Sequence, residues 1–133
     1  MRFKTEIERV VAMRLGDPGA VGEHLQTHLG QVTRDGTWNE WHAERGMLGS
    51  FEIRNIALRI DEEDASRAKL FFDVAPPGIE LGHPLWEDVV PYPARPDASG
   101  SRPYWLAKVR GVQVYLGLDV DFATLESVTI VQR

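Results

Sequence analysis

The chain has 133 residues, of which 43% are apolar and 26% charged, and its formal net charge at pH 7 is −5. That length and balance are ordinary for one globular domain, which buries a core without help from a metal or a disulfide. The chain has no cysteine, which excludes disulfides, thiolate zinc sites, iron–sulfur clusters and cysteine nucleophiles. We expect a single domain over residues 1–133 that uses no cofactor.

Charge and hydropathy also bear on where the protein works. The start, Met1-Arg2-Phe3-Lys4, runs into further charged residues rather than into the apolar run of a signal peptide. No apolar stretch is long enough for a membrane span, and no basic stripe suited to nucleic acid is visible. We expect a soluble cytoplasmic protein that binds neither membrane nor nucleic acid. Its acidity either keeps it dissolved or steers a basic protein partner towards it.

The first thirty residues predict two amphipathic helices. Gly16 is expected to end the first, and Asp17 to cap the second, with Pro18 at a position where its missing N–H costs nothing. Apolar residues recur at helical spacing in both. The first stripe is Phe3, Ile7, Val10 and Val11, and the second is Val21, Leu25, Leu29 and Val32.

The rest of the chain predicts strands. Segments at 37–44, 51–60, 70–74, 104–109, 112–118 and around 128–130 read as strands, and apolar and polar residues alternate most clearly in 70–74 and 112–118. The alternation in 51–60 changes phase, which a bulge near Asn55 would correct. Residues 45–50 read as a loop, and Arg110-Gly111 as a two-residue hairpin turn.

Together these elements predict an α+β fold. Two N-terminal helices would pack on one antiparallel sheet of about six strands, because strands joined by turns favour antiparallel pairing. A long proline-rich loop, residues 76–103, would precede the last three strands and holds seven of the eight prolines.

The histidines suggest two incomplete sites. His24 and His28 have the spacing of two zinc ligands on a helix, but the H-E-x-x-H motif needs a glutamate after the first of them. His42 lies between Glu40 and Glu44, and a carboxylate could orient it as a general base. No further group completes either arrangement, so we expect partly buried or exposed polar side chains here.

The remaining catalytic patterns are also incomplete. Asp119 and Asp121 could hold Mg²⁺ beside a phosphate, but no phosphate-binding loop accompanies them. No serine lies in a G-x-S-x-G elbow. We therefore expect no catalytic residue and no metal site.

Two segments remain as candidate partner-binding surfaces. The first is the proline-stiffened segment 83–92. Its candidate residues have the chemistry of a binding hot spot and are Trp86, Glu87, Asp88 and Tyr92. The alternative is that Trp86 and Tyr92 form a lid over the core. The second is the acidic turn Asp61, Glu62, Glu63 and Asp64, which would either meet a basic partner or be solvated.

The general build resembles that of small cytoplasmic immunity proteins, which bacteria make against polymorphic or contact-delivered toxins. The resemblance covers the acidic chain, the leading helices and a sheet ending in Val112-Gln113-Val114-Tyr115-Leu116 and Leu125-Glu126-Ser127-Val128-Thr129-Ile130. It implies a tight complex with one toxin domain, by active-site occlusion or by locking an inactive conformation. We thus expect a non-catalytic protein-binding domain that neutralises a cognate toxin.

An alternative is a small enzyme or ligand-binding protein. Leading helices followed by a curved antiparallel sheet are similar in order to the cystatin-like cone folds, which enclose an apolar pocket. In such a pocket His42 or Tyr115 would transfer protons. A homodimer is a third option, because the chain has four tryptophans and an edge strand.

Overall fold

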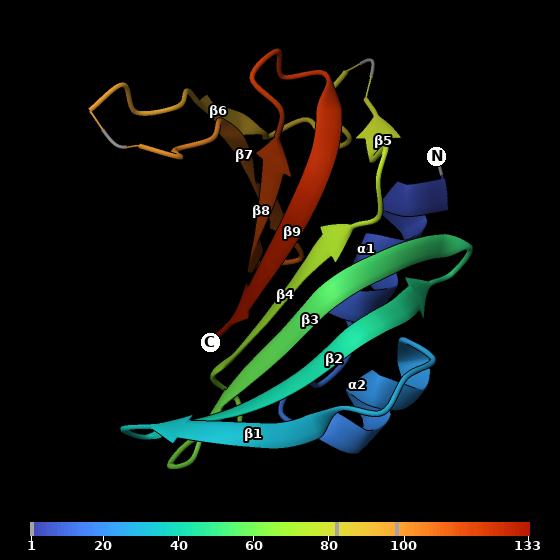
Figure 1. Ribbon diagram of the computed structural model, residues 1–133, viewed down its shortest axis with the longest axis vertical. Helices are drawn as coiled ribbons and strands as arrows, with labels where there is room; N and C mark the ends of the chain where they lie inside the picture. The colour runs from blue at the N-terminus through green and yellow to red at the C-terminus, as the bar shows by residue number, and fades with distance from the viewer. Residues whose placement is uncertain (1, 82, 98) are drawn as a thin grey trace.

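The computed structural model describes residues 2–81, 83–97 and 99–133. These form two short helices and nine strands in one antiparallel sheet (Figure 1). The helices are α1 (Arg2–Val11) and α2 (Pro18–His24). The strands are β1 (Gly30–Asp35), β2 (Trp38–Leu48), β3 (Phe51–Asp61), β4 (Ala68–Val74), β5 (Ile79–Glu80), β6 (Val90–Tyr92), β7 (Tyr104–Val109), β8 (Val112–Leu118) and β9 (Thr124–Gln132).

The predicted α+β class with about six strands is wrong. Strands take up 47% of the chain and helices only 13%, so the molecule is a sheet protein with two helical covers. The strand order is β1-β2-β3-β4-β9-β8-β7-β6, and β5 pairs with β9 beside this path. Two runs of sequential antiparallel strands, β1 to β4 and β7 to β9, are thus joined where β4 pairs with β9.

The helix-to-strand error has a local cause at the end of α2. The helix stops at His24, and Gln26 takes a positive φ of 54° that cannot continue it. Val32, predicted to lie on the helix stripe, is instead 55% exposed on β1. Residues 30–35 therefore pair with β2 as an additional strand.

The predicted loop at 45–50 is likewise mostly strand. β2 continues to Leu48, and Gly49, with φ 61°, makes the turn. Gly46 lies inside β2, and glycine is required there because a Cβ would come within 2.8 Å of the Leu25 carbonyl oxygen. That close approach lets the Met47 N–H donate to the same carbonyl at 2.7 Å, which ties the end of α2 to the strand.

Two turn-chemistry predictions are confirmed. Asn55 has a φ of 52°, and the β3–β4 register shifts between Arg54 and Ala57, as a bulge requires. Arg110 and Gly111 both have positive φ, 50° and 79°, in the hairpin between β7 and β8, as a type I′ turn demands.

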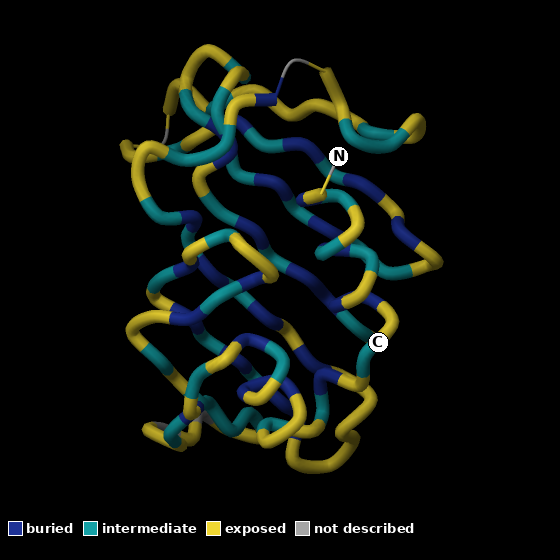
Figure 2. The backbone as a smooth tube through the Cα atoms, turned by 90° about the vertical axis from the view of Figure 1, so that its right-hand side faces the viewer, coloured by how far each residue is buried: buried dark blue, intermediate teal, exposed yellow. Residues whose placement is uncertain are grey.

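The core lies between one side of the sheet and the two helices. The predicted stripe of α1 is buried, and the Asp17 side chain caps α2 by accepting from the Ala20 N–H at 3.2 Å. The helices lie behind β2, β3 and β4 in Figure 1, and buried and exposed residues alternate along the strands in Figure 2. Between β4 and β7 the long connection adds Leu81, Leu85 and Trp86 to the same core.

The C-terminal strand fastens the connection between the helices. The Gln132 side chain accepts from the Leu15 N–H at 3.0 Å and donates to the carbonyls of Val11 and Met13. Backbone groups left unpaired after α1 are satisfied in this way. With this side of the sheet closed, the opposite side is free to present side chains.

Candidate functional site on the open face of the sheet

The side of the sheet opposite the helices is the candidate site, and we call it the open face. Successive residues of a strand point to opposite sides, so residues between core positions lie on it. Strand pairing aligns them in three rows. The rows are Lys69-Val131-Gln113-Lys108, Phe71-Thr129-Tyr115-Leu106-Val90 and Asp73-Ser127-Gly117-Tyr104-Tyr92.

Three tyrosines on adjacent strands form a continuous aromatic surface, which we call the tyrosine ladder. Tyr92 on β6 stacks on Tyr104 of β7, with ring centroids 4.9 Å apart and planes at 12°. Tyr104 in turn lies 5.8 Å from Tyr115 of β8 at a tilt of 51°. Tyr92, at the end of the ladder, is 39% exposed. Such offset ring contacts hold the ladder in one arrangement.

A hollow of about 460 Å³ adjoins the ladder. Small residues of the open face, Gly117, Ser127 and Thr129, line it beside Tyr104 and Tyr115. A Cβ on Gly117 would come 2.1 Å from the Ser127 hydroxyl oxygen. Because Gly117 has no side chain, the sheet surface stays open at the hollow.

Positive charge gathers around the hollow. In the part of the chain that the structure describes, its charged lining residues are Lys69, Arg102 and Arg133, with no aspartate or glutamate side chain. This local balance is opposite to the net charge of −5.

A second group of cations surrounds Trp38 on β2. The indole ring centroid is 5.5 Å from the Arg59 guanidinium carbon, 5.7 Å from that of Arg67 and 5.4 Å from the Lys69 amine. All three distances suit cation–π attraction. Lys69 belongs to this group and to the hollow, so it connects the two.

The structure divides the predicted recognition segment 83–92. Trp86 is half-buried against the core, and its indole nitrogen is buried with no hydrogen-bond partner among the described residues. Glu87 and Asp88 are exposed, whereas Tyr92 belongs to the tyrosine ladder. Trp86 is thus placed as a lid, and Tyr92 as part of a surface.

Replacing Trp86 by alanine is expected to lower the free energy of unfolding by about 1–2 kcal/mol, because a large, partly buried apolar side chain is removed from the core. Urea denaturation measures this loss. Trp86→Phe is the matched control, since it keeps apolar packing and removes the unpaired indole N–H. Unchanged stability together with weakened partner binding would make Trp86 a contact residue instead.

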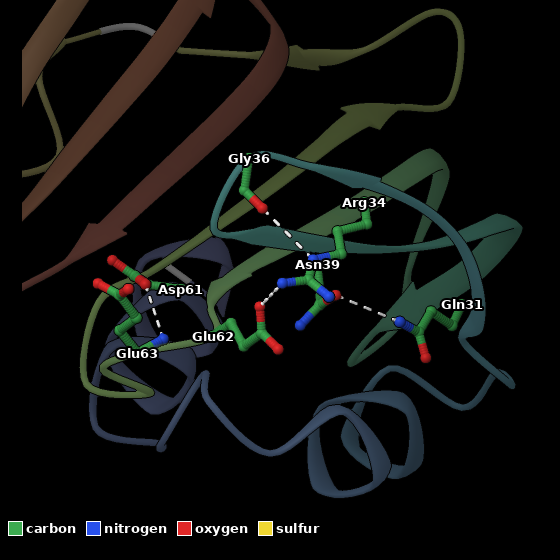
Figure 3. A network of polar contacts seen from close by, with 7 residues as sticks. All are labelled: Gln31, Arg34, Gly36, Asn39, Asp61, Glu62 and Glu63. Atoms are coloured by element: carbon green, nitrogen blue, oxygen red, sulfur yellow. Dashed lines mark hydrogen bonds and ion pairs between the residues drawn. The ribbon is translucent and has the colours of Figure 1, made fainter.

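The predicted acidic turn lies at the other end of the molecule from β6 (Figure 1). Asp61 is only 4% exposed, accepts from the Glu63 N–H at 2.9 Å and pairs with Arg67 at 3.1 Å. Glu62 pairs with Arg34 of β1, and this ion pair joins two neighbouring turns (Figure 3).

Asp64 completes that turn. It accepts from the hydroxyl and the N–H of Ser66, and these two bonds lower the pKa of the Asp64 carboxyl below its ordinary value. The acidic turn therefore fastens β1 and β2 to the β3–β4 connection and is partly neutralised.

The two histidine arrangements differ in outcome: His24 and His28 do not share a helix face, whereas His42 does contact a carboxylate. His24 is the last residue of α2, whereas His28 is exposed beyond the end of that helix. The His42 Nε2 lies 3.2 Å from a carboxylate oxygen of Glu40 rather than of Glu44. Over residues 2–81, 83–97 and 99–133, no three histidine or carboxylate side chains are close enough to hold a metal ion.

Asp119 closes the turn before β9. Its carboxylate accepts from the N–H groups of Ala123 at 2.9 Å and Thr124 at 3.1 Å, and these bonds, the first above all, lower the pKa of Asp119. Asp121 is exposed. The predicted pair is therefore a turn rather than two converging ligands.

The stability supplied by Asp119 depends on pH. Because its pKa is lower in the folded state, its contribution is present above the unfolded pKa of about 4 and is lost as pH falls through the folded pKa. The melting temperature of the wild type should therefore exceed that of Asp119→Asn at neutral pH, and the gap should narrow below about pH 4. Thermal unfolding followed by circular dichroism measures the gap. A gap that stays constant down to acid pH would contradict this role.

The space between α1 and the sheet is filled, and a hollow of about 850 Å³ near this side lies at the connection between the two helices. An apolar pocket of the cone-fold kind would lie between the helices and the sheet, but Phe3 and Ile7 are 0% exposed there and Val10 is 1% exposed. These side chains belong to the continuous core. The open face is therefore the better candidate for ligand contact.

Tyr104 was not among the predicted site residues, and Tyr115 was predicted only as a proton-transfer residue of a cone-fold pocket. The signal was present for Tyr115, because it alternates with Val114 and Leu116, whose burial assigns it to the opposite face. Tyr104 joins the site through its pairing with Tyr92, which only the sheet register reveals.

The fold and site define a class: an antiparallel sheet protein with one helix-covered side and one open, aromatic and cationic side. No protein-family model, no curated protein and no solved structure matches the chain. Among the described residues, no helix is long and apolar enough to cross a membrane.

Proposed function

We propose that this chain is a non-catalytic protein-binding domain whose contact surface is the open face. The tyrosine ladder carries the proposal. Tyrosine and arginine are enriched among the residues that dominate binding energy at protein interfaces. Rings presented by paired strands are already ordered, so binding loses less conformational entropy than it would on a flexible loop.

Within this class, we propose an immunity protein that binds and neutralises a cognate bacterial toxin. The resemblance in build supports this role, and so does a preformed contact surface, because tight complexes require little rearrangement of either partner. Occlusion of a toxin active site would place part of the toxin against Tyr104 and Tyr115.

Site-specific photo-crosslinking tests the proposal. A photoreactive amino acid replaces Thr129, which lines the hollow, and in a matched control it replaces Thr5, which is exposed on α1. Each variant is co-expressed with the product of the adjacent gene, and survival of the cells is scored.

We expect a covalent adduct with that protein from position 129 but not from position 5, together with rescue of the cells. Loss of rescue with no adduct at 129 would overturn the immunity role. An adduct between two copies of this chain would instead indicate a homodimer through the open face.

A further inference from the structure

We infer that the open face receives an acidic protein segment, whose carboxylates lie in the hollow beside Tyr104 and Tyr115. This inference rests on the proposed function and adds the chemistry of the partner. The net charge of −5 suggested a basic partner, but net charge sums the whole surface, whereas association depends on the charges at the contact.

The hollow is the first ground for the inference. Lys69, Arg102 and Arg133 line it, and among the described residues no aspartate or glutamate side chain does so. Arg102 lies 3.7 Å from Glu126, but both side chains are at least half exposed, so water screens that pair. Three cations around one hollow repel each other, and a bound carboxylate relieves that repulsion.

Hydroxyl donors are the second ground. Ser127 and Thr129 come from the same strand and line the hollow together with Lys69. Hydroxyl and ammonium groups both donate to carboxylate oxygens, and hydrogen bonds with a charged member are the stronger ones. The hollow therefore offers the donor set that an acidic side chain requires.

The cations around Trp38 extend this positive region across β2, β3 and β4. Arg59, Arg67 and Lys69 lie within 6 Å of one indole ring, at the distances given above, and Lys69 continues into the hollow. Asp61 offsets Arg67, and Glu40 is the strand partner of Arg59. Lys69 therefore links the cations around Trp38 with those that line the hollow.

A protein segment fits the face better than a nucleic acid. Tyr92 and Tyr104 stack on each other, so they do not offer separated platforms for successive bases. Glu40 and Asp73 also lie on the open face, and they would repel a phosphate backbone, whose affinity depends on a track of cations. A short acidic segment needs only the cations at the hollow, whereas a nucleic-acid backbone needs a continuous track of them.

Fluorescence anisotropy with three labelled probes tests the inference. The probes are a short peptide of alternating Glu and Ser, its Gln and Ser counterpart, and a single-stranded oligothymidine. We expect the Glu peptide to bind at least ~10-fold more tightly than the Gln peptide, with affinity falling as salt rises. Lys69→Glu and Arg102→Glu should each weaken it by about 10-fold, because both residues are exposed and line the hollow. Lys4→Glu on α1 is the matched control and should have no effect.

The outcomes separate the inference from the proposed function. Equal binding of the Glu and Gln peptides, or binding unaffected by both charge reversals, overturns the acidic-segment inference. The protein-binding proposal still stands in that case if Thr129 crosslinks to a protein. Binding of the oligothymidine alone, with no protein adduct at Thr129, overturns both.

Discussion

Replacing Phe72 by alanine is expected to lower the free energy of unfolding by about 3–5 kcal/mol, which is typical for a buried phenylalanine whose cavity cannot close. Phe72 is 0% exposed on β4 and is among the largest fully buried side chains. β4 pairs with β3 on one side and with β9 on the other, so Phe72 lies where the two halves of the sheet meet. Urea denaturation with a two-state fit measures the loss.

Phe71 provides the matched control. It is the neighbouring phenylalanine on the same strand, only partly buried, and it lies on the open face. Phe71→Ala should cost less than about 2 kcal/mol, because Phe71 is only partly buried and part of its ring is already in contact with water. Equal losses for the two variants would contradict the assignment of the core to the helix-covered side.

Replacing Tyr104 by alanine is expected to weaken binding of the partner by at least about 2 kcal/mol, or roughly 30-fold in Kd. Tyr104 is the middle ring of the ladder and contacts both Tyr92 and Tyr115. Its removal takes away one ring and leaves the other two without their shared support. Isothermal titration calorimetry measures the change in Kd, with the partner protein that the crosslink at position 129 identifies as the titrant.

Tyr104→Phe is the control for this prediction, because it keeps the ring and loses only the hydroxyl. We expect its affinity to remain within about threefold of the wild type, since ring packing supplies most of the contact. A melting temperature measured for both variants separates binding from stability. Wild-type affinity in Tyr104→Ala would remove the ladder from the interface.

Several elements were predictable because their signals are local. The α1 stripe, the Asp17 cap, the bulge at Asn55 and the Arg110-Gly111 turn each depend on a few neighbouring residues. Helix periodicity, capping and positive φ are properties of short segments. These local predictions are therefore correct although the predicted fold class is wrong.

The additional strands were not predictable in the same way. β1 follows a helix that ends early, and β2 extends through Gly46, whose role depends on the distant Leu25 carbonyl. β5 and β6 are two and three residues long, too short to show alternation. Pairing with β9 and β7 defines them, and such contacts are nonlocal.

The candidate site shows the same division. Tyr92 was selected from its loop composition, but it was grouped with Trp86, which is close in sequence and packs on the core. The ladder brings Tyr92 together with Tyr104 and Tyr115 through strand register. Asp61 was selected as an exposed acid, yet its pairing with Arg67 buries it.

Nuclear magnetic resonance of the complex shows whether the open face is the partner-binding surface. The partner protein identified by the crosslink at position 129 is titrated into an isotope-labelled sample of this protein, and the backbone amide signals of this protein are followed. We predict that the amide signals of Tyr104, Tyr115 and Thr129 shift most and that the amide signals of α1 do not move. Signal shifts confined to α1, α2 or residues 83–89 would show that the partner does not bind the open face.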